Sequence, residues 1–163
     1  DRPSRRGRAR EPAARASVGP VTFEERVRTS FARQEFMTTI GATLTRVEAG
    51  EVVIEVPHRE DLTQQHGFLH AGVIASIADS ACGYAAFTLM PEDHAVLSVE
   101  FKQNLLAPAK GERFRATARV VKAGRTLTVC TAEVVAVTGA EETLVAVMQG
   151  TMIGLPNRPG REA

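Results

Sequence analysis

Residues 71–90 read AGVIASIADSACGYAAFTLM, and this stretch decides the fold. It holds one charged residue, Asp79, and its other side chains are apolar or small around the whole circumference of a helix. A helix of this kind must be enclosed by the rest of its domain. A membrane would also enclose it, but a carboxylate near the centre of a span would cost about 3 kcal/mol. We therefore expect a helix buried in protein and no membrane partner.

Segments on both sides of this helix alternate apolar and polar residues, which is typical of half-buried strands. Two short runs joined at Ala49-Gly50 precede the helix and four longer runs follow it: 42–47, 51–56, 95–106, 112–122, 126–137 and 143–153. A curved antiparallel sheet is the simplest enclosure for the helix. The expected fold class is therefore α+β, a hotdog fold in which the sheet wraps around a long central apolar helix.

A chain of 163 residues, 44% of them apolar, fits one hydrophobic core. We expect a single domain over residues 21–155, between a disordered basic tail at 1–20 and a flexible C-terminal tail at 156–163. The first tail holds six arginines and three prolines but few large apolar side chains. Four apolar residues after it have the spacing of one face of a short docking helix: Phe23, Val27, Phe31 and Phe36.

The overall charge indicates no polyanionic partner. Lys and Arg total 20 against 19 for Asp and Glu, so we expect neither nucleic acid nor an anionic membrane surface as a partner. Cys82 and Cys130 lie in apolar segments, and no signal-peptide pattern is present. These features favour a reducing, cytoplasmic location.

Asp79 needs an explanation because a buried carboxylate must be paired, protonated or directed into a cavity. The residues three, four and seven positions away are all small: Gly72, Ala75, Ser76, Cys82, Gly83 and Ala86. Such side chains leave room for a ligand beside the carboxylate. They would equally allow close packing, with Asp79 in a buried hydrogen bond. The pattern by itself leaves both interpretations open.

The beginning of the helix offers a second reactive feature. A polar loop ends near His70, so free backbone N–H groups fall at Ala71, Gly72 and Val73. A thioester oxygen placed there would meet these donors and the positive end of the helix dipole. Asp79 lies eight residues farther on, about 12 Å along the axis, too far to serve the same carbonyl easily. A homodimer with two antiparallel helices side by side would bring one chain's Asp79 to its partner's helix start.

Four strings in the chain resemble hotdog thioesterases of the phenylacetyl-CoA type. They are QQHGFLHAGV at 64–73, ADSA at 78–81, LSVEFKQNLLAPAKG at 97–111 and GRT at 124–126. The resemblance covers about residues 41–153 and implies an acyl-CoA thioesterase acting on aryl- or medium-chain acyl groups. It also implies a homodimer or a dimer-of-dimers homotetramer. No metal or organic cofactor is expected, because a thioester is already an activated acyl group.

By position, the resemblance makes Asp79 the general base or the nucleophile, and the two roles stay open. It makes the N–H of Ala71 a donor that polarises the thioester carbonyl, with His70 shaping the turn before the helix. Ser98 matches a polar position that holds the water or the carboxylate. The family often has Asn in place of Gln64 and Gly in place of Ala71, and both replacements keep the amide or the N–H.

Other polar residues have more than one interpretation. Gly72 at the helix start is a candidate substrate-binding residue. Lys122 and Arg125 flank a turn, where they would either meet the phosphates of coenzyme A or belong to an ordinary solvated hairpin. His66 and His70 are four residues apart, but Gly67 opposes a helix there, so no metal site is predicted.

Two further functions stay open. One is a non-catalytic acyl-CoA sensor with the Arg-rich tail as its effector arm, although the tail lacks a helix-turn-helix pattern. The other is a hotdog dehydratase, in which His70 and a carboxylate would transfer protons. The residues around His70 follow the thioesterase pattern instead.

Overall fold

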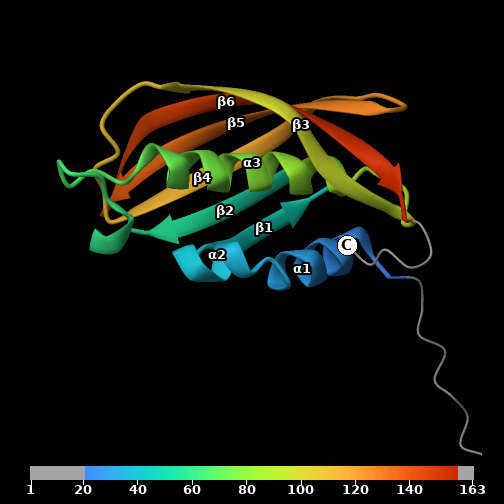
Figure 1. The fold of residues 1–163 in the computed structure, drawn as a ribbon, viewed down its shortest axis with the longest axis horizontal. Coiled ribbons are helices and arrows are strands. Elements are labelled where there is room, and N and C mark those ends of the chain that lie inside the picture. The colour runs from blue at the N-terminus through green and yellow to red at the C-terminus, as the bar shows by residue number, and fades with distance from the viewer. Residues whose placement is uncertain (1–20, 158–163) are drawn as a thin grey trace, which may run out of the picture.

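Six strands form one antiparallel sheet that curves around a central helix (Figure 1). The computed structural model describes residues 21–157, so the predicted tail at 1–20 lies outside the described residues, as does all of the predicted tail at 156–163 except Pro156, which ends β6, and Asn157. The strands run in the order β1-β2-β4-β5-β6-β3, which leaves β1 and β3 at the edges. Their bounds are β1 (Thr43–Glu48), β2 (Glu51–Pro57), β3 (His94–Leu105), β4 (Arg113–Ala123), β5 (Leu127–Thr138) and β6 (Glu141–Pro156). The predicted α+β hotdog arrangement is confirmed.

The central helix α3 (Ala71–Phe87) begins where the sequence predicted and ends three residues before Met90. Thr88 ends it, because its hydroxyl donates to the Ala85 carbonyl at 2.7 Å and accepts from the Gly50 N–H at 2.8 Å. The Thr88 hydroxyl thus provides a donor for one of the last carbonyl groups of the helix, which lack partners within the helix itself.

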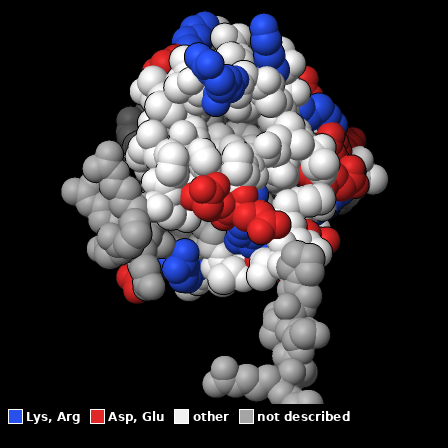
Figure 2. Space-filling model, turned by 90° about the vertical axis from the view of Figure 1, so that its right-hand side faces the viewer, with Lys and Arg blue, Asp and Glu red and all other residues white. Residues whose placement is uncertain are grey.

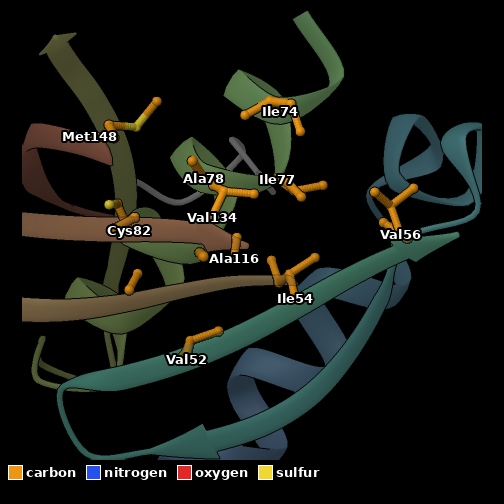
Figure 3. Close-up of a cluster of buried hydrophobic side chains, with 14 of the residues drawn as sticks. Val52, Ile54, Val56, Ile74, Ile77, Ala78, Cys82, Ala116, Val134 and Met148 are labelled. Carbon is orange, nitrogen blue, oxygen red and sulfur yellow. The ribbon is translucent and has the colours of Figure 1, made fainter. Parts of the chain in front are cut away.

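Side chains of α3 and the inner face of the sheet form the core (Figure 3). Ile74 and Ile77 of α3 meet Ile54 of β2 and Val134 of β5, and each of the four is at most 1% exposed. Burying each side chain contributes about 1.5–3 kcal/mol. Small residues such as Ala78, Cys82 and Ala116 let the strands approach the helix closely.

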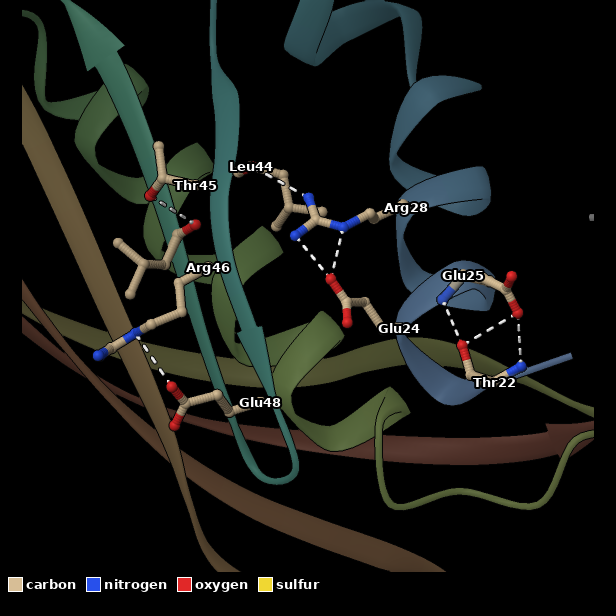
Figure 4. A network of polar contacts seen from close by, with 9 residues as sticks. Thr22, Glu24, Glu25, Arg28, Leu44, Thr45, Arg46 and Glu48 are labelled. Carbon is tan, nitrogen blue, oxygen red and sulfur yellow. Dashed lines mark hydrogen bonds and ion pairs between the residues drawn. The ribbon is translucent and has the colours of Figure 1, made fainter.

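The N-terminal segment forms two helices instead of the single predicted one: α1 (Phe23–Ala32) and α2 (Glu35–Ile40). Thr22 caps α1 in a capping box with Glu25 (Figure 4). The helix is interrupted at Arg33 and Gln34, so the periodicity from Phe23 does not reach Phe36, which is 53% exposed. The prediction that Phe36 lies on the docking face is wrong for that reason.

Arg26 of α1 joins this helix to the end of α3. Its guanidinium donates to the carbonyl groups of Phe87 at 2.8 Å, Met90 at 2.9 Å and Pro91 at 2.6 Å. It also lies over the Phe87 ring, 4.3 Å from the ring centroid. The positive charge therefore satisfies carbonyl groups at the negative end of the α3 dipole.

We expect Arg26→Met to lower the free energy of unfolding by about 2–3 kcal/mol, because half-buried carbonyl groups lose a charged donor. Arg28→Met is the matched control, since Arg28 pairs with Glu24 on the exposed face of α1 (Figure 4) and such pairs contribute about 0.5 kcal/mol. Urea unfolding of both variants measures the difference. Equal losses in the two variants would contradict the assigned role of Arg26.

Charges of both signs are interspersed on the face that Figure 2 shows. Basic side chains gather at its top, and acidic ones lie across the middle and at the right. This face therefore presents no continuous surface of one sign to a polyanion. Within residues 21–157, no helix combines the length and the apolar character that crossing a membrane requires.

Candidate active site

The carboxylate of Asp79 is half-buried and held by a side chain from the sheet. Ser98 on β3 donates its hydroxyl to Oδ1 of Asp79 at 2.7 Å. The pairing of β3 with β6 shifts register between Ser98 and Glu100, which marks a β-bulge. Bulges commonly redirect a side chain next to an active site. Sequence resemblance placed Ser98 near Asp79, and the structure brings the two together.

Asp79 also faces open space. It lines a pocket of about 170 Å³ together with Gly83, Tyr84 and Ser98. A Cβ atom added to Gly83 would meet no atom within 4 Å. The small residues around Asp79 therefore leave room for a ligand, which favours the cavity interpretation over a purely structural buried hydrogen bond.

The start of α3 presents one free N–H donor. His70 is the N-cap, and its Nδ1 accepts from the N–H of Gly72 at 2.9 Å. The carbonyl of His70 accepts from the N–H of Val73 at 2.9 Å. Among residues 21–157, no acceptor engages the N–H of Ala71. Of the three candidate donors at the helix start, Ala71 is thus the one open to a substrate oxygen.

Gly72 has a steric role at this turn. A Cβ atom at this position would lie 2.9 Å from Nδ1 of His70, inside van der Waals contact. The absence of a side chain lets the imidazole approach the backbone and cap the helix. The N–H of Gly72 donates to the His70 cap, so it is not a free donor for a substrate.

Gln64 and Ala71 share a second pocket, of about 410 Å³. Most of its other lining is apolar, including Phe68, Leu105 and Leu106. The loop of Gln64 is fixed by backbone hydrogen bonds, among them the N–H of Gln64 to the Phe68 carbonyl at 2.9 Å. Oε1 of Gln64 accepts from the N–H of His66. The lining of this pocket therefore includes both the Gln64 amide and the residue with the free donor, Ala71.

The two pockets of one chain share no lining residue. Asp79 and Ser98 belong to one, and Gln64 and Ala71 belong to the other. Four of the predicted site residues therefore lie in two separate pockets, which we call half-sites.

Lys122 and Arg125 lie in neither half-site. Both are exposed, at the end of β4 and in the turn before β5. His66 is likewise exposed, in the turn that ends at Gly67. The structure thus does not bring these basic residues together with Asp79 or Ala71 in one chain.

Ser30 and Gln34 also line the Asp79 pocket, although the sequence did not identify them. They come from α1 and the link to α2, and only the packing of α1 against α3 brings them to Asp79. Tyr84 also lines this pocket, and its hydroxyl lies 3.4 Å from Oγ of Ser30. No sequence pattern connects these residues, because 54 positions separate Ser30 from Tyr84.

We expect Ser98→Ala to lower kcat about tenfold with little change in KM, because one hydrogen bond to a charged group contributes about 1.5–3 kcal/mol. Ser98 acts by holding Asp79, so Ser98→Thr, which restores a hydroxyl, should recover most of the lost rate. Steady-state kinetics of both variants test this. A higher KM with unchanged kcat would mean that Ser98 only binds substrate.

Comparisons with known proteins show which family the chain resembles. Residues 66–143 match the family model of the thioesterase superfamily. A crystal structure of a thioesterase family protein from Silicibacter pomeroyi has 52% identity and a TM-score of 0.81, over 83% of this chain and 99% of that one. The 1,4-dihydroxy-2-naphthoyl-CoA hydrolase of Listeria monocytogenes is 31% identical over 53% of this chain and 71% of its own. A Saccharolobus solfataricus protein named as an esterase is 35% identical, and the match spans 51% of this chain and 59% of that protein.

Proposed function

Because the chain belongs to the thioesterase superfamily and is a thioester hydrolase, we propose that its substrate is an aryl- or medium-chain acyl-CoA. Asp79 either activates a water molecule or attacks the thioester carbonyl carbon directly. The N–H of Ala71 stabilises the oxyanion that develops on the carbonyl oxygen. One observation carries this assignment. The carboxylate of Asp79, the one charged side chain of α3, accepts a hydrogen bond from Ser98 and lines a cavity.

The reaction then needs two protomers. Eight helical residues separate Ala71 from Asp79, which is about 12 Å along the axis, and the two residues line different pockets. A homodimer with antiparallel α3 helices would join Asp79 of one protomer to Ala71 and Gln64 of the other. A dimer-of-dimers homotetramer is the larger assembly proposed.

The edge of the sheet supports this assembly. Strand β3 is paired with β6 on one side only, and its Leu97, Val99 and Phe101 are 56%, 54% and 45% exposed. A long edge strand with exposed apolar side chains is a surface that proteins normally cover. A second copy of β3 would cover it, next to the Ser98 that holds Asp79.

The remaining assignments concern the coenzyme. Lys122 and Arg125 are exposed cations that would meet its phosphates, and the backbone at Gly72 would contact the substrate near the thioester. Because the acyl group is already activated, no metal or organic cofactor is proposed. A cytoplasmic location fits a coenzyme A substrate. The name of the Listeria relative, an aryl acyl-CoA hydrolase, supports the aryl class.

Thiol release from a panel of aryl and aliphatic acyl-CoAs tests the proposal. Free Cys82 and Cys130 are buried, and burial raises the pKa of both thiols, that of Cys130 to about 11. Both thiols therefore stay protonated near neutral pH, so the folded protein adds little background to a thiol assay.

Two outcomes of the panel would replace the proposal. Tight acyl-CoA binding with no hydrolysis would indicate the non-catalytic sensor. Formation of enoyl-CoA without free thiol would indicate a dehydratase that uses His70. The hydrogen bond from the Gly72 N–H to Nδ1 of His70 favours a capping role for this imidazole over proton transfer.

A further inference from the structure

The pocket beside Asp79 has a polar wall to which the proposed reaction assigns no role. The wall consists of Ser30 of α1, Gln34 in the link to α2, and Ser80 and Tyr84 of α3. The pocket has a volume of about 170 Å³. Liquid water takes about 30 Å³ per molecule, and an ordered water needs two to four polar partners. The wall therefore suits a few ordered water molecules next to the carboxylate.

Gln34 reaches this pocket from a fixed backbone position. It is the N-cap of α2, where a side chain normally accepts from the first N–H groups of the helix, but it makes no such bond. Its N–H donates to the Phe31 carbonyl at 3.0 Å, and its carbonyl accepts from the Met37 N–H at 3.0 Å. The backbone of Gln34 is thus held at both polar groups, and its side chain lines the pocket instead of capping α2.

The Gln34 amide is oriented by α3 and keeps its donors. Oγ of Ser80 donates to Oε1 of Gln34 over 3.4 Å, and within residues 21–157 this is the one hydrogen bond of the amide group. A usual hydroxyl hydrogen bond is about 2.8 Å long, so the amide has room to adjust to a water molecule. Its Nε2 carries two N–H donors. A half-buried donor without a protein partner normally engages water.

The carboxylate of Asp79 has acceptor sites for the same water. Ser98 donates to its Oδ1 at 2.7 Å, and a carboxylate has about four acceptor sites. Tyr84 is the other titratable side chain of the pocket lining. Burial raises the pKa of the Tyr84 phenol, which stays protonated at neutral pH and cannot serve as the base. Asp79 is therefore the group of this pocket that can take a proton from water.

Building on the proposed function, we propose that Gln34 is a positioning residue that holds the attacking water beside Asp79. Nε2 of Gln34 donates to the water oxygen, and the water donates one O–H to the carboxylate. Ser80 keeps the amide in the orientation that this requires. The second lone pair of the water oxygen is then free to attack the thioester carbonyl carbon.

In the reaction, Asp79 removes a proton from the water as it attacks. A C–O bond forms, the carbonyl π electrons move to the oxygen at the N–H of Ala71, and one water proton passes to the carboxylate. When the intermediate collapses, the C–S bond breaks and the coenzyme thiolate takes the proton from Asp79. The products are the free acid and coenzyme A. Gln34 exchanges no proton in either step, so its role is to position the water.

Gln34→Met keeps the length of the side chain and removes the amide. With the acyl-CoA of the panel that the parent hydrolyses fastest, we expect kcat of the full chain to fall about tenfold and KM to change less than about twofold, because one hydrogen bond to the water is lost. Gln34→Glu keeps an oxygen for Ser80 but has no N–H donor, so it should lose at least as much. Gln149→Met is the matched control, because Gln149 is exposed on β6, and it should keep the parental kcat.

A competing nucleophile separates water positioning from a structural role. Methanol in the buffer gives a methyl ester wherever it attacks in place of water. The Met side chain of Gln34→Met no longer holds water and favours the methyl group, so the ratio of methyl ester to free acid should rise about threefold or more. Mass spectrometry measures both products. A purely structural change would lower both together and leave the ratio unchanged.

Ser80→Ala is a second variant, which does not depend on the folding of Gln34→Met. Alanine is favourable in a helix, so α3 should stay intact. The amide of Gln34 loses its anchor, and we expect kcat to fall about threefold and the ester ratio to rise. Melting temperatures of all the variants should stay near that of the parent.

The outcomes separate this inference from the proposed function. A kcat for Gln34→Met within about twofold of the parent, a parental kcat in Gln34→Glu, or an unchanged ester ratio would overturn the water-positioning role. A higher KM at constant kcat would overturn it as well, because Gln34 would then bind substrate. All of these results leave hydrolysis through Asp79 intact. If the parent chain hydrolyses no acyl-CoA of the panel, the proposed function fails and the inference fails with it.

Discussion

Replacing Asp79 with asparagine should lower kcat/KM for acyl-CoA hydrolysis by about 100-fold or more, the range typical for loss of a general base. Asn keeps the shape of the side chain, and its Oδ1 can still accept from Ser98, so the pocket should stay folded. Its uncharged amide can neither take a proton from water nor attack a carbonyl. Thiol release under substrate-limiting conditions measures the effect.

Asp93→Asn is the matched control, because it makes the same chemical change on a carboxylate that is 76% exposed. The control should keep the parental rate. Equal melting temperatures for the three proteins would show that the loss in Asp79→Asn is chemical. A rate within about threefold of the parent would rule out Asp79 as base or nucleophile, since the role predicts far more.

Ala71→Pro should remove the oxyanion donor and leave the helix in place. Ala71 is the first residue of α3, where proline is well tolerated. His70 has φ −61° and ψ 135°, which suits a residue before proline. Loss of one oxyanion donor typically lowers kcat about 100- to 1000-fold. Ala71→Gly, which keeps the N–H, should retain most of the activity.

Mixed dimers of the two inactive variants give the sharpest test of a shared site. In the proposed dimer, each site takes Asp79 and Ala71 from different chains, so a dimer with one Asp79→Asn chain and one Ala71→Pro chain has one site in which both groups are intact. Mixed dimers purified through two different tags should therefore recover about half of the parental activity, one site of two. If both groups acted within one chain, the mixed dimers would be as inactive as either variant.

The features that the sequence predicted well depend on local patterns. Alternation of apolar and polar residues predicted six strands, and uniform apolarity predicted the enclosed helix from Ala71. Asp79 was identifiable because a carboxylate in such a helix is costly unless it has a partner or a cavity. The helix start at Ala71 followed from the polar loop that ends at His70.

The features that the sequence did not predict depend on contacts between distant segments. Periodicity from Phe23 to Phe36 indicated one helix, but α1 ends at Ala32, where capping contacts outweigh the pattern. The polar wall of Ser30 and Gln34 exists only because α1 packs against α3.

The candidate site shows the same contrast between local sequence patterns and contacts of distant segments. The sequence by itself determined that the chain would enclose a carboxylate-bearing helix in a curved sheet, because burial and periodicity are properties of neighbouring residues. Only the tertiary structure decided that Ser98, beside a bulge in β3, donates to Asp79 and that the His70 cap leaves Ala71 as the free donor. It also placed Asp79 and Ala71 in two separate pockets, because different segments distant in the sequence pack beside each of them.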